Sequence, residues 1–155
     1  MLLKQNYTRS LVLLIMTFLV ISCQSLKTAV YDQYSYQQAI SLKVESDAII
    51  DHATTPFRDH INVITGLRMD LKKLVEYEKN KPNNSISYAM LQLLENEDRN
   101  LLGGFLKRWE EEQQLSEAFT KEAKAQIMEA FDLIIKYEAE KNKTNETNIL
   151  NFLEK

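Results

Sequence analysis

Residues that make turns are scarce in this 155-residue chain, and this scarcity limits its possible folds more than any other feature. Only three glycines and two prolines are present. An all-β domain needs turn residues about every 8–12 positions, which this chain does not supply. Apolar residues instead recur at three- and four-residue spacing, as in Ile64, Leu67, Leu71 and Leu74, which is the spacing of one helix face. The sequence therefore predicts an all-α fold.

Apolar periodicity and capping residues together predict four helical regions. Thr55 is suited to an N-cap position and Pro56 to the first position of a helix, and the turn 81–85 ends in a capping residue. The predicted regions span residues 31–53, 56–80, 86–113 and 116–141. Helices of similar length joined by short connections pack as antiparallel neighbours. We therefore expect residues 31–141 to form one domain, an up-down-up-down four-helix bundle.

Two segments could make this bundle less regular. The run 95–100 is wholly polar and is soon followed by Gly103 and Gly104, so a break within 95–104 would divide the third region into two shorter helices. Residues 142–155 form a polar tail with a short apolar end, which is expected to be mobile over 142–148.

The first 23 residues differ from the rest of the chain. Lys4 and Arg9 precede an apolar segment, 11–21, and the only cysteine, Cys23, follows soon after it. As a helix, this segment would extend roughly 16 Å, whereas the core of a bilayer is about 30 Å thick. The order of charge, short apolar segment and small residue is that of a cleaved export signal, here residues 1–22.

The end of this segment, Val20-Ile21-Ser22-Cys23, resembles the lipobox of bacterial lipoproteins, with Val20 where leucine is more common. The resemblance implies that Cys23 becomes the first mature residue and carries a diacylglycerol thioether and an amide-linked acyl chain such as palmitate. It also implies sorting to the outer membrane, facing the periplasm, because Gln24 rather than aspartate follows the cysteine. The mature helical chain looks similar to small exported lipoproteins of bacteria.

Removal of the signal leaves an acidic domain. Lys4 and Arg9 are lost with it, so 17 basic and 22 acidic side chains remain, a net charge of −5. Phosphate neutralisation supplies most of the affinity of nucleic-acid binding, so no nucleic-acid partner is expected. We expect acyl chains on Cys23 to hold the protein to the membrane through a short tether, residues 23–30, with another envelope protein as its partner.

The glycines and one charged pair suggest a site in the middle of the bundle. Counting from the turn near residue 82 places Gly66 level with Gly103 and Gly104, and Arg68 level with Asp98. Glycine inside a helix costs about 1 kcal/mol relative to alanine, so these positions require a reason. The glycines indicate either close helix approach or a ligand site. An Arg68–Asp98 ion pair would either fix helix register or bind an anion.

Two histidines, each beside an aspartate, lie on either side of the Thr54-Thr55-Pro56 turn. An antiparallel hairpin would bring Asp51, His52, Asp59 and His60 to one end of the bundle, where they could hold zinc. The metal-binding motifs HExxH and Glu-x-x-His are absent, and His60 lies on an apolar stripe typical of a core histidine. We therefore expect no metal or cofactor.

The sequence contains no signature of catalysis, such as Gly-x-Ser-x-Gly or a glycine-rich phosphate loop. It is most consistent with a non-catalytic lipoprotein that binds another protein, with its apolar tail, residues 149–153, as one contact. Two alternatives remain. One is a small-molecule-binding bundle, similar only in helix number to the sensory modules of bacterial receptors. The other is a metal protein that uses His52 and His60.

Overall fold

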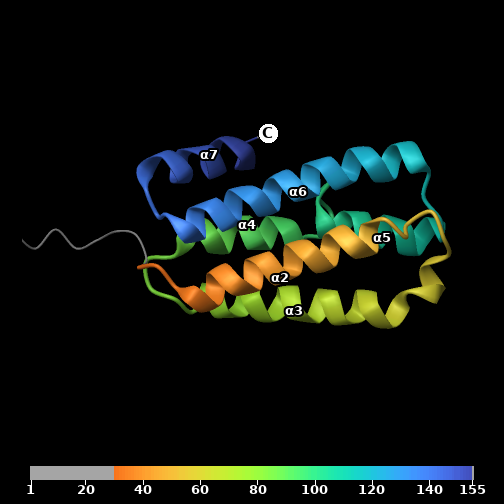
Figure 1. Ribbon diagram of the computed structural model, residues 1–155, viewed down its shortest axis with the longest axis horizontal. Helices are drawn as coiled ribbons and strands as arrows, with labels where there is room; N and C mark the ends of the chain where they lie inside the picture. Colours follow the sequence, from red (N-terminus) through yellow and green to blue (C-terminus); the bar gives the residue numbers. More distant parts are fainter. Residues whose placement is uncertain (1–29, 155) are drawn as a thin grey trace, which may run out of the picture.

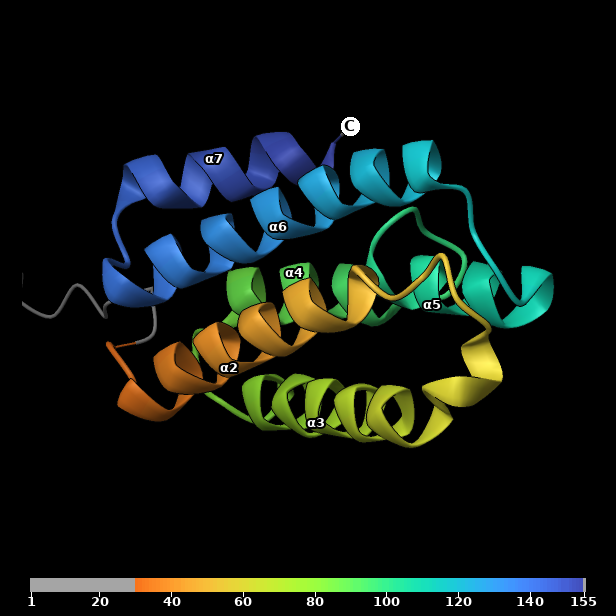
Figure 2. The same cartoon turned by 45° about the vertical axis from the view of Figure 1, so that its right-hand side comes forward.

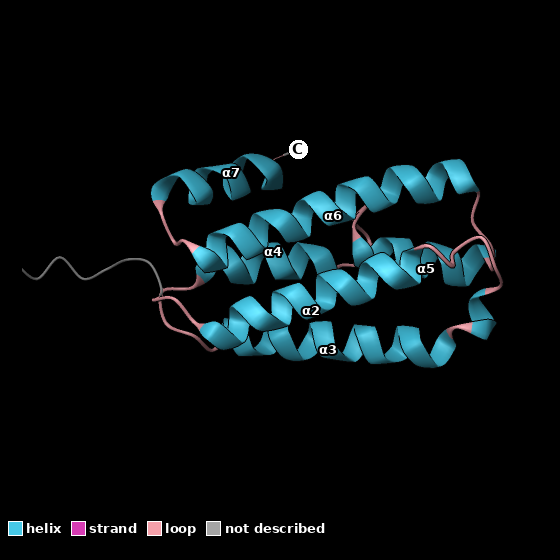
Figure 3. Ribbon diagram, in the orientation of Figure 1, coloured by secondary structure: helices cyan, strands magenta, loops and turns pink. Residues whose placement is uncertain are grey.

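The computed structural model describes residues 30–154, which form helices joined by short loops (Figure 3). The helices are α2 (Gln33–Ile50), the short 3-10 helix η1 (Phe57–Asp59), α3 (Ile61–Lys79), α4 (Ser85–Glu95), α5 (Leu102–Glu112), α6 (Glu117–Ala139) and α7 (Lys143–Leu153). No β-strand occurs within 30–154, and the predicted all-α fold is confirmed. The predicted export signal and Cys23 lie outside these residues.

The long helices run side by side along the long axis of the molecule (Figures 1 and 2). Helix α2 packs against α3 and α6, and α4 packs against the same two helices from the other side. Helix α5 continues the direction of α4 towards the end of the molecule where α3 and α6 begin. None of the helices within 30–154 is long and apolar enough to cross a membrane.

The helix boundaries agree closely with the sequence prediction at three of four starts. Asp32 caps α2 by accepting a hydrogen bond from the Tyr34 amide at 2.9 Å, and Ser116 caps α6 by accepting one from Phe119 at 3.3 Å. Thr55 does not cap the second helical region. Its hydroxyl donates to the His52 carbonyl instead, and η1 intervenes before α3 begins at Ile61.

The third helical region is broken, as the polar run indicated. Helix α4 ends at Glu95 and α5 begins at Leu102. A methyl group added at Gly103 would lie 2.1 Å from the Glu95 carbonyl oxygen, and one at Gly104 would lie 1.9 Å from the Arg99 carbonyl oxygen. The two glycines therefore allow the start of α5 to pass against the backbone of the preceding loop, which confirms the close-approach interpretation for this pair.

The tail differs from expectation, because most of it forms helix α7. The Asn142 side chain caps this helix by accepting a hydrogen bond from the Asn145 backbone N–H. The side-chain Nδ2 of Asn145 donates to the Glu140 and Lys136 carbonyls at the end of α6. Ile149 is fully buried. Helix α7 packs on α4 and α6 along its length (Figure 1). The polar residues of the segment thus provide the cap and the exposed face of an amphipathic helix.

One hydrophobic core runs through the helices and is closed at the end away from Val30 by two paired loops. The Phe57 amide donates to the Gln113 carbonyl at 2.8 Å, and the Leu115 amide donates to the Ala53 carbonyl at 2.9 Å. Trp109 is fully buried at this end, and its indole N–H donates to the Thr55 carbonyl at 2.9 Å.

The structure also contains an internal repeat that relates α2 to α4 and α3 to α6. Ser35 and Ser87 are each the third residue of their helix, and a tyrosine follows each. The motif Tyr-Glu-x-x-Lys occurs near the ends of α3 and α6, beginning at Tyr77 and at Tyr137. Helix α7 follows the second repeat and covers its outer side. In the part of the chain that the structure describes, no helix lies in the equivalent place on α2 and α3 (Figures 1 and 2).

Candidate functional site

The three glycines do not line a common cavity in the part of the chain that the structure describes. Gly66 is exposed on α3, and a methyl group added there would meet no atom within 4 Å. Gly103 and Gly104 lie at the α4–α5 break, where backbone fills the adjacent space. The prediction counted residues from the turn near residue 82 along one continuous third helix, but the loop between α4 and α5 interrupts this helix.

The predicted Arg68–Asp98 ion pair is wrong for the same reason. Arg68 pairs with Glu110 of α5 at 2.9 Å, and Asp98 pairs with Lys107 at 3.1 Å. The Asp98 side chain is 87% exposed because it lies in the loop rather than on an apolar helix face. The Arg68–Glu110 pair still joins the second and third helical regions, so Arg68 connects the elements that were expected.

The two histidines come together, as the hairpin argument predicted, but the aspartates do not join them. The imidazoles of His52 and His60 stack with ring centroids 4.9 Å apart, and His60 Nε2 lies 2.8 Å from the Thr55 hydroxyl. Asp51 instead binds Lys124 at 2.6 Å, and Asp59 lies 3.9 Å from Arg58. Within 30–154 no group of three or more histidine, cysteine, aspartate or glutamate residues is arranged to hold a metal ion.

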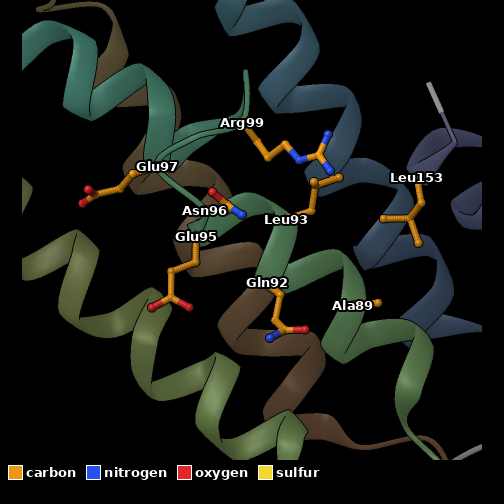
Figure 4. Close-up of a pocket in the computed structure, with 8 residues that line it drawn as sticks. All are labelled: Ala89, Gln92, Leu93, Glu95, Asn96, Glu97, Arg99 and Leu153. Atoms are coloured by element: carbon orange, nitrogen blue, oxygen red, sulfur yellow. The ribbon is translucent and has the colours of Figure 1, made fainter.

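The α4–α5 break forms an open groove that continues beneath the end of α7 (Figure 4). Leu93 and Leu153 supply apolar surface, and Gln92, Asn96 and Arg99 supply hydrogen-bonding groups. The Arg99 side chain forms no ion pair with another described residue. The groove thus combines an apolar patch, uncharged polar groups and an unpaired cation, with Glu95 and Glu97 on its far rim.

Two buried glutamates at the opposite end of the hairpins form the most elaborate polar arrangement in the described chain. Glu78 and Glu138 are each 1% exposed. Glu78 accepts hydrogen bonds from Ser35 and Asn84, and Lys81 lies 3.1 Å away. We call this set the Glu78 cluster.

The second repeat builds a matching set, the Glu138 cluster. Glu138 accepts a hydrogen bond from Ser87, and its carboxylate lies 2.9 Å from Lys141. Asn84 connects the clusters, because its amide nitrogen donates to Glu78 and its oxygen accepts from Lys141 at 3.1 Å. Both carboxylates are buried and accept hydrogen bonds from residues of other helices, so the network is suited to fixing the helix ends.

Neither Glu78 nor Glu138 was among the site residues predicted from the sequence. The available signal was the repeated Tyr-Glu-x-x-Lys motif at residues 77–81 and 137–141. Each lysine directly follows the C-cap residue of its helix, Asn80 or Glu140, and lies beside the tyrosine and the glutamate of its motif. Lys81 lies 5.6 Å from the centroid of the Tyr77 ring, and Lys141 lies 5.0 Å from that of Tyr137.

Asp32 joins the Glu78 cluster at its exposed edge. Burial alone would raise the pKa of its carboxyl, but hydrogen bonds from Tyr77, Lys81 and the Tyr34 amide outweigh burial and lower the pKa to about 2. The same hydrogen bond to Asp32 is the main reason that the pKa of Tyr77 is raised to about 12. Asp32 therefore stays ionised and paired with Lys81, 3.2 Å away, at the end of the molecule where α2 begins.

Comparison with known proteins gives no relative: no protein-family model, curated protein or solved structure matches this chain. The function must therefore be argued from the chain itself.

Proposed function

We propose that this chain is a non-catalytic interaction module, anchored by lipid in the bacterial cell envelope and facing the periplasm from the outer membrane. The observation that carries the proposal is Cys23, the only cysteine, at the end of an apolar segment too short to span a bilayer. A lone thiol at an export junction has no disulfide partner within the chain, and lipid attachment gives it a role.

The fold supports this proposal by its arrangement at the anchored end. We propose that α2, α3, the broken pair α4–α5, and α6 form an up-down-up-down bundle. Helices α2 and α4 begin at the same end of this bundle (Figure 1), and Val30 lies three positions before α2 begins. Val30 lies seven positions after Cys23, a reach of about 25 Å at most. The anchor would therefore hold this end near the bilayer and leave the other end and the long sides free.

We assign partner binding to the groove at the α4–α5 break. Interfaces combine a packed apolar centre with polar groups at the rim, and arginine is enriched among the residues that dominate binding energy. Leu93 and Leu153 supply the first of these features here, and Arg99 supplies the second. Leu153 belongs to the apolar tail, residues 149–153, whereas Ile149 of the same tail is buried in the chain's own core.

Lipid attachment is tested by expressing the full chain in bacteria supplied with labelled palmitate. We expect label in the wild-type protein and none in Cys23→Ser, with both proteins exported. Absence of label from the exported wild-type protein would refute the anchor.

The partner surface is tested in the same cells by placing a photo-crosslinking amino acid at Arg99 and, as a matched control, at Val44. Val44 is 62% exposed on α2, away from the groove. We expect a discrete adduct with one envelope protein from position 99 only. Equal adducts from both positions, or none from position 99, would reject the groove as the interface.

A mid-bundle ligand site and a site at the histidines have less support. Backbone occupies the space beside Gly103 and Gly104, and His52 and His60 lack further ligands within 30–154. Native mass spectrometry of residues 24–155 purified from a bacterial periplasm is expected to give the mass of the bare chain. A retained small molecule or metal would favour these alternatives instead.

A further inference from the structure

Exposed tyrosines gather at the end of the bundle where the chain enters α2. Val30, Tyr31, Tyr34 and Tyr77 are 76%, 54%, 44% and 42% exposed, respectively. The rings of Tyr34 and Tyr77 are in contact, with centroids 4.7 Å apart. We call these four residues the tyrosine surface. It joins the start of α2 to the last turns of α3.

The internal repeat shows that this position is one that the fold otherwise covers. Tyr77 of α3 corresponds to Tyr137 of α6, which is only 2% exposed. Burial is the main cause that raises the pKa of Tyr137 to about 12, and the charge of Glu146 on α7 adds to it. In the first repeat, no described helix takes the place of α7, and the equivalent aromatic surface remains open.

The polar groups around the tyrosine surface are largely neutralised. Lys73 binds Asp70 at 2.8 Å, and Lys79 binds Glu76 at 3.3 Å. Tyr77 retains a fixed orientation because its hydroxyl donates to Asp32 at 2.7 Å. A surface of amphipathic rings with little net charge suits the zwitterionic headgroup region of a bilayer, where tyrosine is enriched.

We infer that the tyrosine surface rests on the lipid headgroups and sets the orientation of the tethered domain, an inference that depends on the proposed lipidation of Cys23. Val30, the member of this surface that is nearest to Cys23 in the chain, can lie at most about 25 Å from the anchor. Such tethering gives a high effective concentration, so even a weak contact forms much of the time. The bundle then stands with the groove near Arg99 exposed to a partner.

The test uses the single cysteine and single tryptophan of residues 23–155. The Cys23 thiol is coupled to a maleimide lipid in phosphatidylcholine vesicles whose acyl chains are brominated near the headgroup, because bromine quenches nearby tryptophan. Tyr34→Trp introduces a probe in the tyrosine surface. Val44→Trp is the matched control, since it lies on the same helix about 15 Å farther along. Trp109, buried at the opposite end, reports the background in all three proteins.

We expect the brominated vesicles to remove most of the emission that Tyr34→Trp adds, and to leave the emission of Val44→Trp and of Trp109 unchanged. Equal emission of Tyr34→Trp in brominated and ordinary vesicles would overturn the inference. Quenching of Val44→Trp to the same extent would also overturn it, because the bundle would then lie on its side.

A second measurement identifies a competing occupant. If sedimentation of the uncoupled domain shows a dimer that Tyr31→Ser/Tyr34→Ser abolishes, the surface binds a second copy, and the membrane contact is rejected. Because the coupling is chemical, none of these outcomes depends on lipidation in cells. A failure of the palmitate experiment and a failure of this one are therefore separate.

Discussion

Loss of the Lys141 cation should be one of the most destabilising single changes in this protein. The Glu138 and Lys141 side chains are 2% and 5% exposed, and their charged atoms lie 2.9 Å apart. In Lys141→Met the Glu138 carboxylate would remain buried with Ser87 as its donor, while its second oxygen already has no partner among the described residues. Removing one partner of a buried pair costs about 3–5 kcal/mol.

A change of this size is a large part of the stability of a typical domain, about 5–15 kcal/mol. Lys143→Met is the matched control, because Lys143 is 86% exposed and lies 3.7 Å from Glu146. Surface pairs contribute at most about 1 kcal/mol, so the control should unfold close to wild type. Urea unfolding of residues 24–155, followed by the emission of the buried Trp109, measures both variants.

A double-mutant cycle separates the charge effect from lost packing. Glu138→Gln with Lys141→Met removes both charges and keeps an amide oxygen for the Ser87 hydroxyl. We expect the double variant to recover at least about 2 kcal/mol relative to the sum of the single changes. If Lys141→Met costs no more than Lys143→Met, or if the two changes are additive, the argument for a coupled buried pair is refuted.

Three further predictions use the same unfolding assay. Gly66→Ala should raise the free energy of unfolding by about 0.5–1 kcal/mol, because its methyl group meets no atom within 4 Å. Gly103→Ala should lower it by about 1–3 kcal/mol, because its methyl group meets the Glu95 carbonyl. Equal effects of the two changes would contradict the roles assigned to these glycines. Ile149→Ala should lower the free energy of unfolding by about 2–5 kcal/mol, because Ile149 is fully buried. Leu150→Ala should lower it much less, because Leu150 is 39% exposed. A negligible effect at Ile149 would mean that α7 does not pack on the bundle in solution. Because the pKa of Asp32 is lowered to about 2 from 3.8, its contribution to the free energy of unfolding is complete above pH 3.8 and is lost as the pH falls towards 2. Asp32→Asn should flatten this part of the pH–stability profile. An unchanged profile would exclude Asp32 as the source of the pH dependence.

Much of the local structure could be predicted from the sequence because its causes are local. The scarcity of turn residues and the apolar spacing predicted helices, and the polar run 95–100 with Gly103 and Gly104 indicated the break that the structure contains. The meeting of His52 and His60 followed from a single turn between two helices. Each of these inferences depends on residues close together in the chain.

Contacts between distant residues were predicted less well. The proposed Arg68–Asp98 pair failed because a six-residue loop shifts the register between the second and third helical regions. Helix α7 was taken for a mobile tail because its periodicity is short, and its stability depends on packing against α4 and α6. The candidate sites failed where they required a register across helices.

The sequence by itself determined that the described residues are helical and where α2, α4 and α6 begin. The tertiary structure alone decided that Glu78 and Glu138 are buried with lysine partners, that Tyr137 is covered and Tyr77 open, and that Gly66 is exposed. The physical reason is one of range. Helix propensity and capping act over a few neighbouring residues, whereas burial and pairing depend on how helices far apart in the chain are packed.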